Sequence, residues 1–556
     1  MSATLNPLER LQQLADLERT DITTLLAYGV GIGLMSLATP IAMQALVNTI
    51  AFGALFQPLL VLTLILLVLT VFSNTMAALQ FYVVEMLQRR IFVRYFKTAA
   101  ERLQQVDHTT HDHHFLPELC NRFFDVVTLQ KTSSVLLLET LGYVLQTLIG
   151  MVLLAFYHPV LLAFDMFLIA SLMFILFYLG KQGISTAIEQ SKAKYAAAAW
   201  LENIATYRLL AKSAQNRIFL QQQTDQIAIH YLEACTRHFR ILSRQNIGAL
   251  SLHALANTSL LGLGGWMVIE RQLSLGQLIA AELVVNTMIY GMTRLGKTLD
   301  NFYEMCTSID KVGHLLDLPQ ESLSGEVDTH GSEGFKVELH HVSVPLNPQM
   351  DFLQPINLVI DPGERVVFSR GAEQGTILDL LFGLRTPSTG FLLLNKQNMR
   401  DLRLGQLRDS MTLVRDAEIL EASIADNLRM GRDIDLNYLR RVLTQVGLDE
   451  TVSSLPQGFS TCMTLSGIPL NKEQCLRLTL ARAILTRPRL MMLDGVLDRL
   501  DEQTLPNIIE CLFDADAPWT LILTSQLPEV IQRCNRHLQI KDGYIVNLTE
   551  MRESLI

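Results

Sequence analysis

The sequence predicts a multi-domain membrane protein in which a helical membrane domain precedes an α/β domain. Two observations carry this prediction. Before about residue 300 the chain contains apolar runs too long for ordinary core helices, and 49% of all residues are hydrophobic. Beyond residue 335 short apolar segments alternate with helical stretches, which is the pattern of an α/β domain. The 556 residues are enough for two or more domains.

Six apolar stretches are long enough to span a membrane. They lie near 22–47, 57–84, 134–157, 159–180, 246–270 and 275–298. The sixth contains Glu282, and a carboxylate at membrane depth is costly unless it faces the bundle interior or a cavity. Glu282 is therefore a candidate for a substrate path, and the alternative is a position near the outer end of the span, within reach of water.

Basic residues predict the orientation of these spans. Lys and Arg are frequent in 86–133 and 181–245, whereas the connections at 48–56 and around His158 contain none. Because positive charge collects on the cytoplasmic side, both termini and both long loops are expected in the cytoplasm. The loops contain few Gly or Pro, so long cytoplasmic helices are expected. Residues 1–20 have apolar positions every third residue, which predicts an amphipathic helix at the membrane surface.

Charge and cysteine usage narrow the possible functions. The net charge of −9 argues against a nucleic-acid binder, which would show a basic face. None of the seven cysteines has CxxC spacing, so a zinc or disulfide framework is not expected. One cluster contains residue types that can bind zinc, but a solvated loop or helix end is the favoured interpretation and no metal is assigned. Its members are Asp107, His108, His111, His113 and His114.

The region 335–556, which follows a polar linker at 319–334, contains motifs in a known order. Segments 361–369, 380–390, 480–485, 490–494 and 521–524 resemble, in order and spacing, the nucleotide-binding domain of ABC transporters. Together with six spans and two long cytoplasmic loops, the whole chain (with a membrane domain at 21–318) resembles an ABC exporter half-transporter. The stretches 200–212 and 275–280 are similar to exporters of the type I secretion kind.

This resemblance implies an architecture and partners. The expected fold is a six-helix ABC exporter (type I) transmembrane bundle followed by an α/β P-loop NTPase-like domain. Such half-transporters work as dimers, so a second half-transporter is expected, in a homodimer or a heterodimer. The resemblance further implies a multi-pass protein of the bacterial inner membrane, export of a peptide, protein or lipid-like substrate, and partnership with a periplasmic adaptor protein and an outer-membrane channel.

Most positions that would hold or hydrolyse ATP depart from the family pattern. The phosphate loop lacks its Lys, with Gln374 at the best-aligned position, and Arg415 replaces the Gln of the Q-loop. Asp494 keeps the metal-side carboxylate, but Gly495 follows it where a Glu is expected. The aligned nucleotide positions are Gly371, Gln374, Gly375, Thr376, Arg415, Asp494, Gly495, Asp501 and Ser525. The aligned signature positions are Leu470, Asn471, Lys472, Glu473 and Gln474.

These departures predict a pseudo-ATPase domain without a catalytic residue and with no assigned cofactor. Each charge-assisted phosphate contact contributes about 1.5–3 kcal/mol, so losing two or three weakens Mg-ATP binding by orders of magnitude. Arg370 and Arg415 remain candidates for binding another anion. Two alternatives stay open: an ATP-driven exporter with an atypical nucleotide site, and a non-transporting scaffold or regulator of a secretion assembly.

Overall fold

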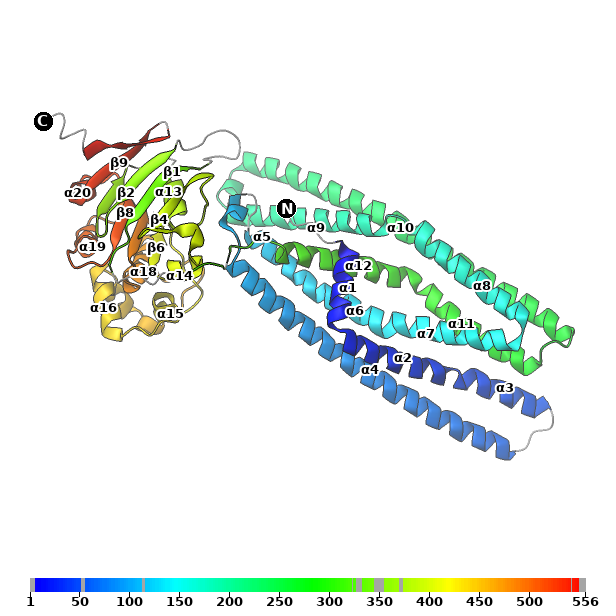
Figure 1. Ribbon diagram of the computed structural model, residues 1–556. Helices are drawn as coiled ribbons and strands as arrows, with labels where there is room; N and C mark the ends of the chain where they lie inside the picture. Colours follow the sequence, from blue (N-terminus) through cyan, green and yellow to red (C-terminus); the bar gives the residue numbers. More distant parts are fainter. Residues whose placement is uncertain are drawn as a thin grey trace. The chain divides into compact units, whose positions relative to one another are not determined.

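The computed structural model describes residues 6–51, 56–112, 116–322, 324–326, 333–344, 355–369, 374–541 and 543–549 (Figure 1). The chain forms two compact units. The helical unit contains Met1–Val106 and His113–Pro319. The α/β unit contains Gln320–Ile556 together with the short segment Asp107–Asp112 from the first long loop.

Twelve α-helices are described in the helical unit. Their bounds are α1 (Pro7–Leu17), α2 (Arg19–Ser36), α3 (Ala38–Ala51), α4 (Phe56–Gln104), α5 (Leu116–Cys120), α6 (Asp125–Val135), α7 (Leu141–Tyr157), α8 (Pro159–Met173), α9 (Gly183–Thr206), α10 (Ala214–Ile269), α11 (Leu275–Thr293) and α12 (Leu295–Leu316). Shorter turns connect them at η2 (Asn121–Phe124), η3 (Leu136–Thr140), η4 (Phe174–Leu179) and η5 (Leu210–Lys212).

Five helical stretches are long and apolar enough to cross a membrane, and each overlaps a predicted span. They are Arg19–Thr49, Phe56–Gln104, Leu116–Tyr157, Pro159–Leu179 and Ala214–Ile269. A shorter apolar helix, Leu275–Met288, lies in the sixth predicted span. The helices α4 and α10, of 49 and 56 residues, continue well beyond their apolar segments, as the scarcity of Gly and Pro in the long loops predicts.

Helix α4 exposes its apolar side chains. In its most apolar 18-residue window the mean hydropathy is 2.3 and no residue is buried within the chain. Leu64, Leu67 and Phe72, for example, are 58%, 59% and 49% exposed. A surface of this composition requires lipid or another protein chain against it.

Helix α1 covers part of the amphipathic segment predicted for residues 1–20. It packs against α12, and the Arg10 guanidinium forms an ion pair with the carboxylate of Asp317. A capping box between Asn6 and Glu9 starts the helix, with Pro7 in its first turn. A helix therefore forms in the predicted segment and packs on α12, and its place at the membrane surface stays a prediction.

The α/β unit contains two sheets and eight described α-helices. The strands are β1 (Val337–Ser343), β2 (Ile356–Ile360), β3 (Arg365–Phe368), β4 (Thr389–Leu394), β5 (Gln397–Asn398), β6 (Met411–Val414), β7 (Leu490–Asp494), β8 (Thr520–Thr524), β9 (Arg536–Lys541) and β10 (Tyr544–Asn547). The helices are α13 (Gln374–Leu381), α14 (Leu404–Arg408), α15 (Ile424–Arg429), α16 (Leu436–Gln445), α17 (Asp449–Ser454), α18 (Lys472–Leu485), α19 (Leu505–Leu512) and α20 (Pro528–Arg533). Single turns are η1 (His108–Asp112), η6 (Met399–Asp401), η7 (Gly458–Ser460) and η8 (Leu497–Arg499).

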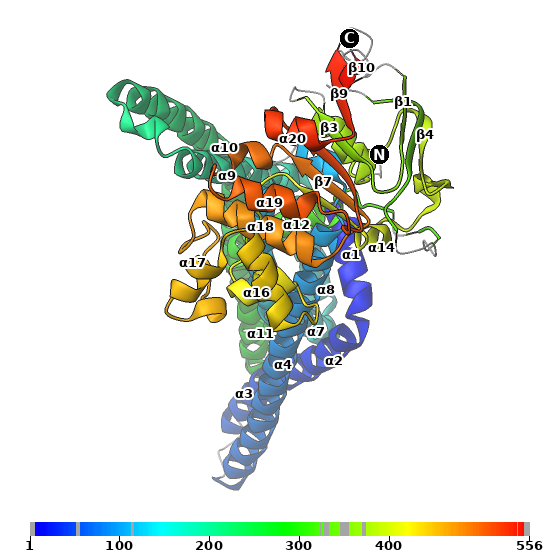
Figure 2. The same ribbon diagram turned by 90° about the vertical axis from the view of Figure 1, so that its left-hand side faces the viewer.

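The larger sheet separates two hydrophobic cores. Its strand order is β10-β9-β3-β8-β7-β6, with only β10 antiparallel to its neighbour. Side chains alternate between the faces: Leu521 and Leu523 of β8 pack with α16, α18 and α19, whereas Ile522 packs with α13 and the smaller antiparallel sheet β2-β1-β4-β5. Figure 2 shows α16, α18 and α19 grouped together. Burial on both faces explains why these strands are apolar throughout.

The parallel strands also define where a site can form. Because β3, β8, β7 and β6 run in the same direction, the residues that end or follow them meet at one edge of the sheet. These residues are Ser369, Ser525, Asp494 and Arg415. Three of them are positions that the sequence predicts for a nucleotide site.

Candidate functional site

Gln374, at the position of the phosphate-loop Lys, is bound to the protein's own backbone. It begins α13, is 4% exposed, and its Nε2 donates to the Ser369 carbonyl at 2.6 Å. Gly375 and the half-buried Thr376 follow in the first turn. Gly371, like Arg370 and Glu373, lies outside the described residues. The Gln374 amide therefore helps to cap the strand-to-helix turn.

Arg415 occupies the centre of the carboxyl edge. Its Nε donates to Asp494 Oδ2 at 2.6 Å, and its Nη2 donates to Asp379 Oδ1 at 2.9 Å and to the Gly375 carbonyl at 3.3 Å. Thr524 Oγ1 donates to the other oxygen of Asp494, Oδ1, at 3.0 Å. Both oxygens of the Asp494 carboxylate therefore have a donor within the protein.

The charges at this edge balance one another. Burial alone would lower the pKa of Arg415, but attraction to Asp379 and hydrogen bonds to Asp494 and Asp379 outweigh it and raise the pKa above its ordinary value. Asp379 is 6% exposed, and its Oδ2 is 3.3 Å from Arg385 Nε. Arg415 and Arg385 thus form a network of ion pairs with Asp379 and Asp494.

Gly495 and the turn after it are joined to Arg415 by a second arginine. Gly495 has φ +63°, a left-handed conformation that glycine adopts without strain, and its carbonyl accepts from Arg499 Nε at 3.1 Å. Arg499 also donates to the Arg415 carbonyl and forms a 2.8 Å ion pair with Asp416. In the pattern of ABC transporters this position has a carboxylate that orients water. Here it is a glycine in a backbone turn that Arg499 stabilises by hydrogen bonds.

Ser525 and Asp501 both take part in local hydrogen bonds. Ser525 is fully buried, and its Oγ donates to Asp498 Oδ1 at 2.5 Å. Asp501 Oδ1 accepts from the backbone amides of Thr504 and Gln503 at 2.8 and 3.0 Å. The hydrogen bond from the Thr504 amide is the main reason that the pKa of Asp501 lies below its usual value.

The predicted signature positions form the N-terminus of α18. Leu470 is buried, and Asn471 and Gln474 exchange hydrogen bonds in a capping box, each accepting from the other's backbone amide at 2.8 and 2.9 Å. Lys472 is exposed. Glu473 pairs at 2.8 Å with Arg477, whose side chain is 7% exposed.

The Asp/His cluster in the first long loop lies partly outside the described residues, because His113 and His114 are not described. Asp107 Oδ1 accepts from the amide and the hydroxyl of Thr109 at 2.8 and 2.6 Å, as an Asx turn before η1. His108 and His111 lie in η1. Across the described part of the chain no group of three or more His, Cys, Asp or Glu is arranged to hold a metal ion.

Glu282 is exposed on the surface of the single chain. The buried positions of α11 around it are Ala281, Val284, Val285 and Met288. Helix α11 therefore buries its small and apolar side chains, and a role of Glu282 in a substrate path stays a prediction.

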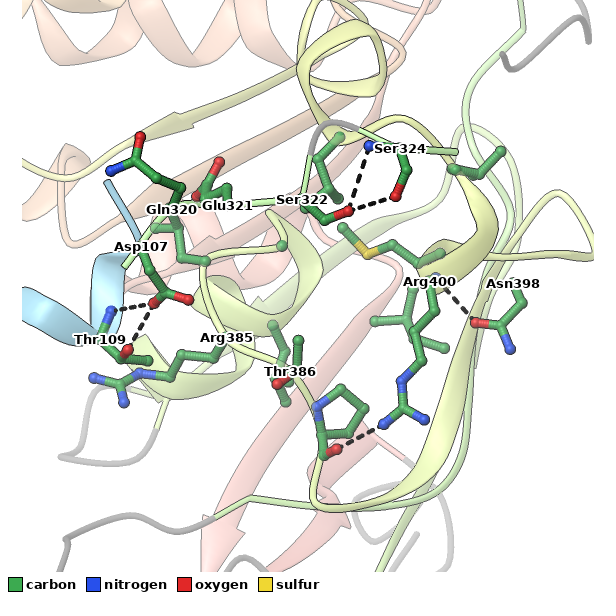
Figure 3. Close-up of a pocket in the computed structure, with 18 residues that line it drawn as sticks. Asp107, Thr109, Gln320, Glu321, Ser322, Ser324, Arg385, Thr386, Asn398 and Arg400 are labelled. Carbon is green, nitrogen blue, oxygen red and sulfur yellow. Dashed lines mark hydrogen bonds between the residues drawn. The ribbon is translucent and has the colours of Figure 1, made fainter. Parts of the chain in front are cut away.

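A hollow of about 320 Å³ opens elsewhere in the α/β unit (Figure 3). It is bordered by the end of α13 and the following turn, by β4 and η6, and by the segments around Asp107 and Gln320. Its polar groups are engaged: Glu321 forms a bidentate pair with Arg408 at 2.6 and 3.0 Å, and Arg400 donates to the Pro387 carbonyl at 2.8 Å. These pairings stabilise the hollow's walls, so Arg415 and its partners remain the candidate site.

Sequence reasoning missed four residues of this network: Asp379, Asp498, Arg499 and Thr524. Asp379 had a detectable signal, because it is the single charge in the apolar helix segment 377–381 and a buried carboxylate needs a cation. Asp498, Arg499 and Thr524 had none, since charged and hydroxyl residues beside strand ends are ordinary.

Comparison with known proteins finds sequence similarity to toxin translocation proteins. No protein-family model matches it. It is 25% identical over 325 residues to the exotoxin translocation ATP-binding protein PaxB of Pasteurella aerogenes, covering 57% of this chain and 46% of PaxB. It is 25% identical over 292 residues to the alpha-hemolysin translocation ATP-binding protein HlyB of Escherichia coli O157:H7, covering 51% and 41%. The chain spans about half the length of the curated relatives it matches.

A solved structure extends the likeness to the whole chain. The structure of a bacterial Atm1-family ABC exporter with ATP bound superposes with a TM-score of 0.84 and covers 97% of both chains at 16% identity. The fold is therefore that of an ABC exporter, which confirms the predicted fold class. The sequence relatives are toxin and hemolysin translocation proteins, which confirms the predicted resemblance to exporters of the type I secretion kind.

Proposed function

We propose that this protein is a transport subunit of the bacterial inner membrane that exports a polypeptide and whose α/β domain is a pseudo-ATPase. The likeness to toxin translocation proteins supports a polypeptide substrate. The exposed apolar helices of the helical unit support a location in the membrane.

One observation carries the pseudo-ATPase part of the proposal: Arg415 bridges Asp494 and Asp379. In P-loop NTPases the carboxylate at the Asp494 position holds Mg²⁺. Here the guanidinium neutralises that carboxylate at 2.6 Å, and Thr524 uses its second oxygen. A divalent ion at Asp494 would have to displace the guanidinium of Arg415, which is part of the chain. The ion and the guanidinium would also repel each other, because both are positively charged.

Other positions agree with this interpretation. The chain has no Lys between Lys336 and Lys396 to bind phosphates, and Gln374 is committed to the Ser369 carbonyl. Gly495 cannot orient water, and Ser525 is buried against Asp498. At the helix that would face a partner's nucleotide, Lys472 and Glu473 bring side chains where close backbone approach to phosphate favours glycine. The residues therefore do not fit Mg-ATP as a P-loop site binds it.

The test is Mg-ATP binding to the purified full-length chain, titrated to millimolar concentration, beside Asp494→Ala. We expect no saturable binding by either protein, with an ABC exporter that has intact motifs as the positive control in the same detergent. Saturable binding that Asp494→Ala abolishes would instead establish an atypical ATP-driven exporter.

A second measurement tests transport. Deleting the gene should remove at least one polypeptide from the medium, and both the wild-type chain and Asp494→Ala should restore it equally. An unchanged set of exported proteins after deletion would contradict the transport role and favour a scaffold or regulator.

The same proposal includes assembly. The exposed apolar side chains of α4 support pairing with a second half-transporter. The translocation role of the relatives supports partnership with a periplasmic adaptor protein and an outer-membrane channel. A heterodimer with an intact partner would not restore an unaltered nucleotide site, because each composite site would take either the phosphate loop or the signature helix from this chain, and both depart from the family pattern.

A further inference from the structure

A polar cavity lies inside the helical unit, lined by residues outside the six apolar stretches that the sequence predicts to span the membrane. Its volume is about 300 Å³, and it is enclosed by α6, α9, α10 and α12. Eleven of its twelve lining side chains are polar or charged. They are Asp125, Thr128, Gln190, Ser191, Lys194, Tyr231, His238, Asp300, Glu304, Thr307 and Ser308, with Ala187 as the twelfth lining residue.

Acidic side chains outnumber basic side chains in the lining of this cavity. Asp125 and Lys194 offset each other, with Lys194 Nζ 3.5 Å from Asp125 Oδ1. Asp300 and Glu304 lie one turn apart on α12, and among the described residues no ion pair joins either to a basic side chain. Burial, and then repulsion from Asp300, raises the pKa of Glu304 above its usual value. Like charges at this spacing destabilise a helix unless a cation lies between them.

Buried polar groups distinguish the cavity from an ordinary solvated face. Ser191 is 6% exposed, and within the described residues its hydroxyl has no hydrogen-bond partner. His238 is 5% exposed, with Nδ1 3.1 Å from Thr186 Oγ1 and its ring edge-on to Tyr303. A buried hydroxyl without a partner is costly, so a bound polar group at Ser191 would recover its hydrogen bond.

The lining and the volume of the cavity limit the kinds of ligand that it can bind. The described residues hold no group of three or more His, Cys, Asp or Glu arranged for a metal ion, so a bare metal ion is not the expected occupant. The volume is at the small end of ligand pockets, which suits a group of a few heavy atoms.

We propose that this cavity binds an organic cation through an ammonium or guanidinium group. Asp300 and Glu304 accept its N–H donors as counter-charges, and the Ser191 hydroxyl accepts a further hydrogen bond. The same chemistry is present in a free diamine and in a Lys or Arg side chain of a polypeptide. The site does not depend on whether the α/β domain binds ATP.

The experiment measures binding of two probes to the purified full-length chain: 1,5-diaminopentane, and a short end-blocked peptide containing one Lys. Saturable binding is expected, and the double variant Asp300→Asn/Glu304→Gln should weaken it at least about tenfold, since it removes charge-assisted hydrogen bonds. Ser191→Ala should weaken it by a smaller factor. Preferential binding of one probe would identify the source of the cationic group.

Control variants distinguish binding in the cavity from nonspecific attraction of the cation to acidic side chains. Glu233→Gln removes one exposed carboxylate of α10 outside the cavity and should leave affinity unchanged. The double variant should unfold at the wild-type temperature or above it, because it removes like-charge repulsion. Equal binding of uncharged 1,5-pentanediol, unchanged affinity in the double variant, or an equal loss in Glu233→Gln would overturn the proposal.

Discussion

Arg415 lies at the carboxyl edge of the larger sheet, between Asp379 and Asp494. At this position the family pattern has a neutral Gln, and the change to Arg adds a permanent charge beside two aspartates. Asp494 alone, seen in the sequence, looks like a preserved metal ligand. Its partners, Arg415 and Thr524, show that its oxygens are already used.

Replacing this arginine provides a direct prediction. Arg415→Gln leaves Asp379 and Asp494, whose side chains are 8% and 22% exposed, without their shared cation. We expect the free energy of unfolding of the α/β domain to fall by about 1–3 kcal/mol, because Asp379 keeps only Arg385 and Asp494 keeps only the Thr524 hydroxyl as partners. The thermal unfolding midpoint of the full chain in detergent should fall by roughly 2–12 °C. Arg403→Gln, at an exposed position of the same domain, is the control, and an equal midpoint in both variants would contradict the bridging role.

Helix α18 illustrates how an element can keep its place after its sequence changes. The helix still begins where a signature helix begins, because Asn471 and Gln474 cap it and its buried face packs against β7 and β8. Glu473, at a position where the sequence alignment predicts a glycine of the signature, forms an ion pair with Arg477. Arg477 in turn donates to the Val446 and Gly447 carbonyls at 3.3 and 2.9 Å and so connects α18 to the loop after α16.

Restoring glycine to this helix should therefore destabilise it. Glu473→Gly removes the near carboxylate of Arg477, leaving Asp501 at 3.8 Å. Compared with Lys472→Gly, which makes the same backbone change at an exposed neighbour, we expect an additional loss of about 1.5–3 kcal/mol. That loss corresponds to a midpoint lower by roughly 3–12 °C. If both glycine variants unfold at the same temperature, Glu473 has no stabilising part in α18.

The chain as a whole combines an apolar surface that needs lipid with an α/β unit that has two complete cores. The apolar surface includes the 18-residue window of α4 in which no residue is buried within the chain. The two cores are the hydrophobic clusters on either face of the larger sheet. The distribution of Lys and Arg predicts the direction of insertion into the membrane.

Reporter fusions test that direction. Alkaline phosphatase joined after residue 53, in the connection without Lys or Arg, should be active, because that connection is expected outside the cytoplasm. The same enzyme joined after residue 112, in the basic first long loop, should be inactive, whereas a green fluorescent protein at residue 556 should fluoresce. The opposite pattern at residues 53 and 112 would show that the predicted orientation is wrong.

Much of the fold could be predicted because its signals are local. An apolar stretch such as 57–84 is longer than an ordinary core helix. The apolar strand that ends at Asp494 is recognisable from its composition. The absence of a Lys from the phosphate loop can likewise be read directly from the sequence.

The tertiary structure decided which side chains meet. Arg415 binds Asp379, 36 positions away, and Asp494, 79 positions away. The polar cavity joins α6 to α12 across more than 170 positions, from Asp125 to Glu304. Periodicity and composition act over one or two turns of helix, so they predict elements. Ion pairs and cavities depend on the packing of elements distant in the chain, and only the folded molecule contains that information.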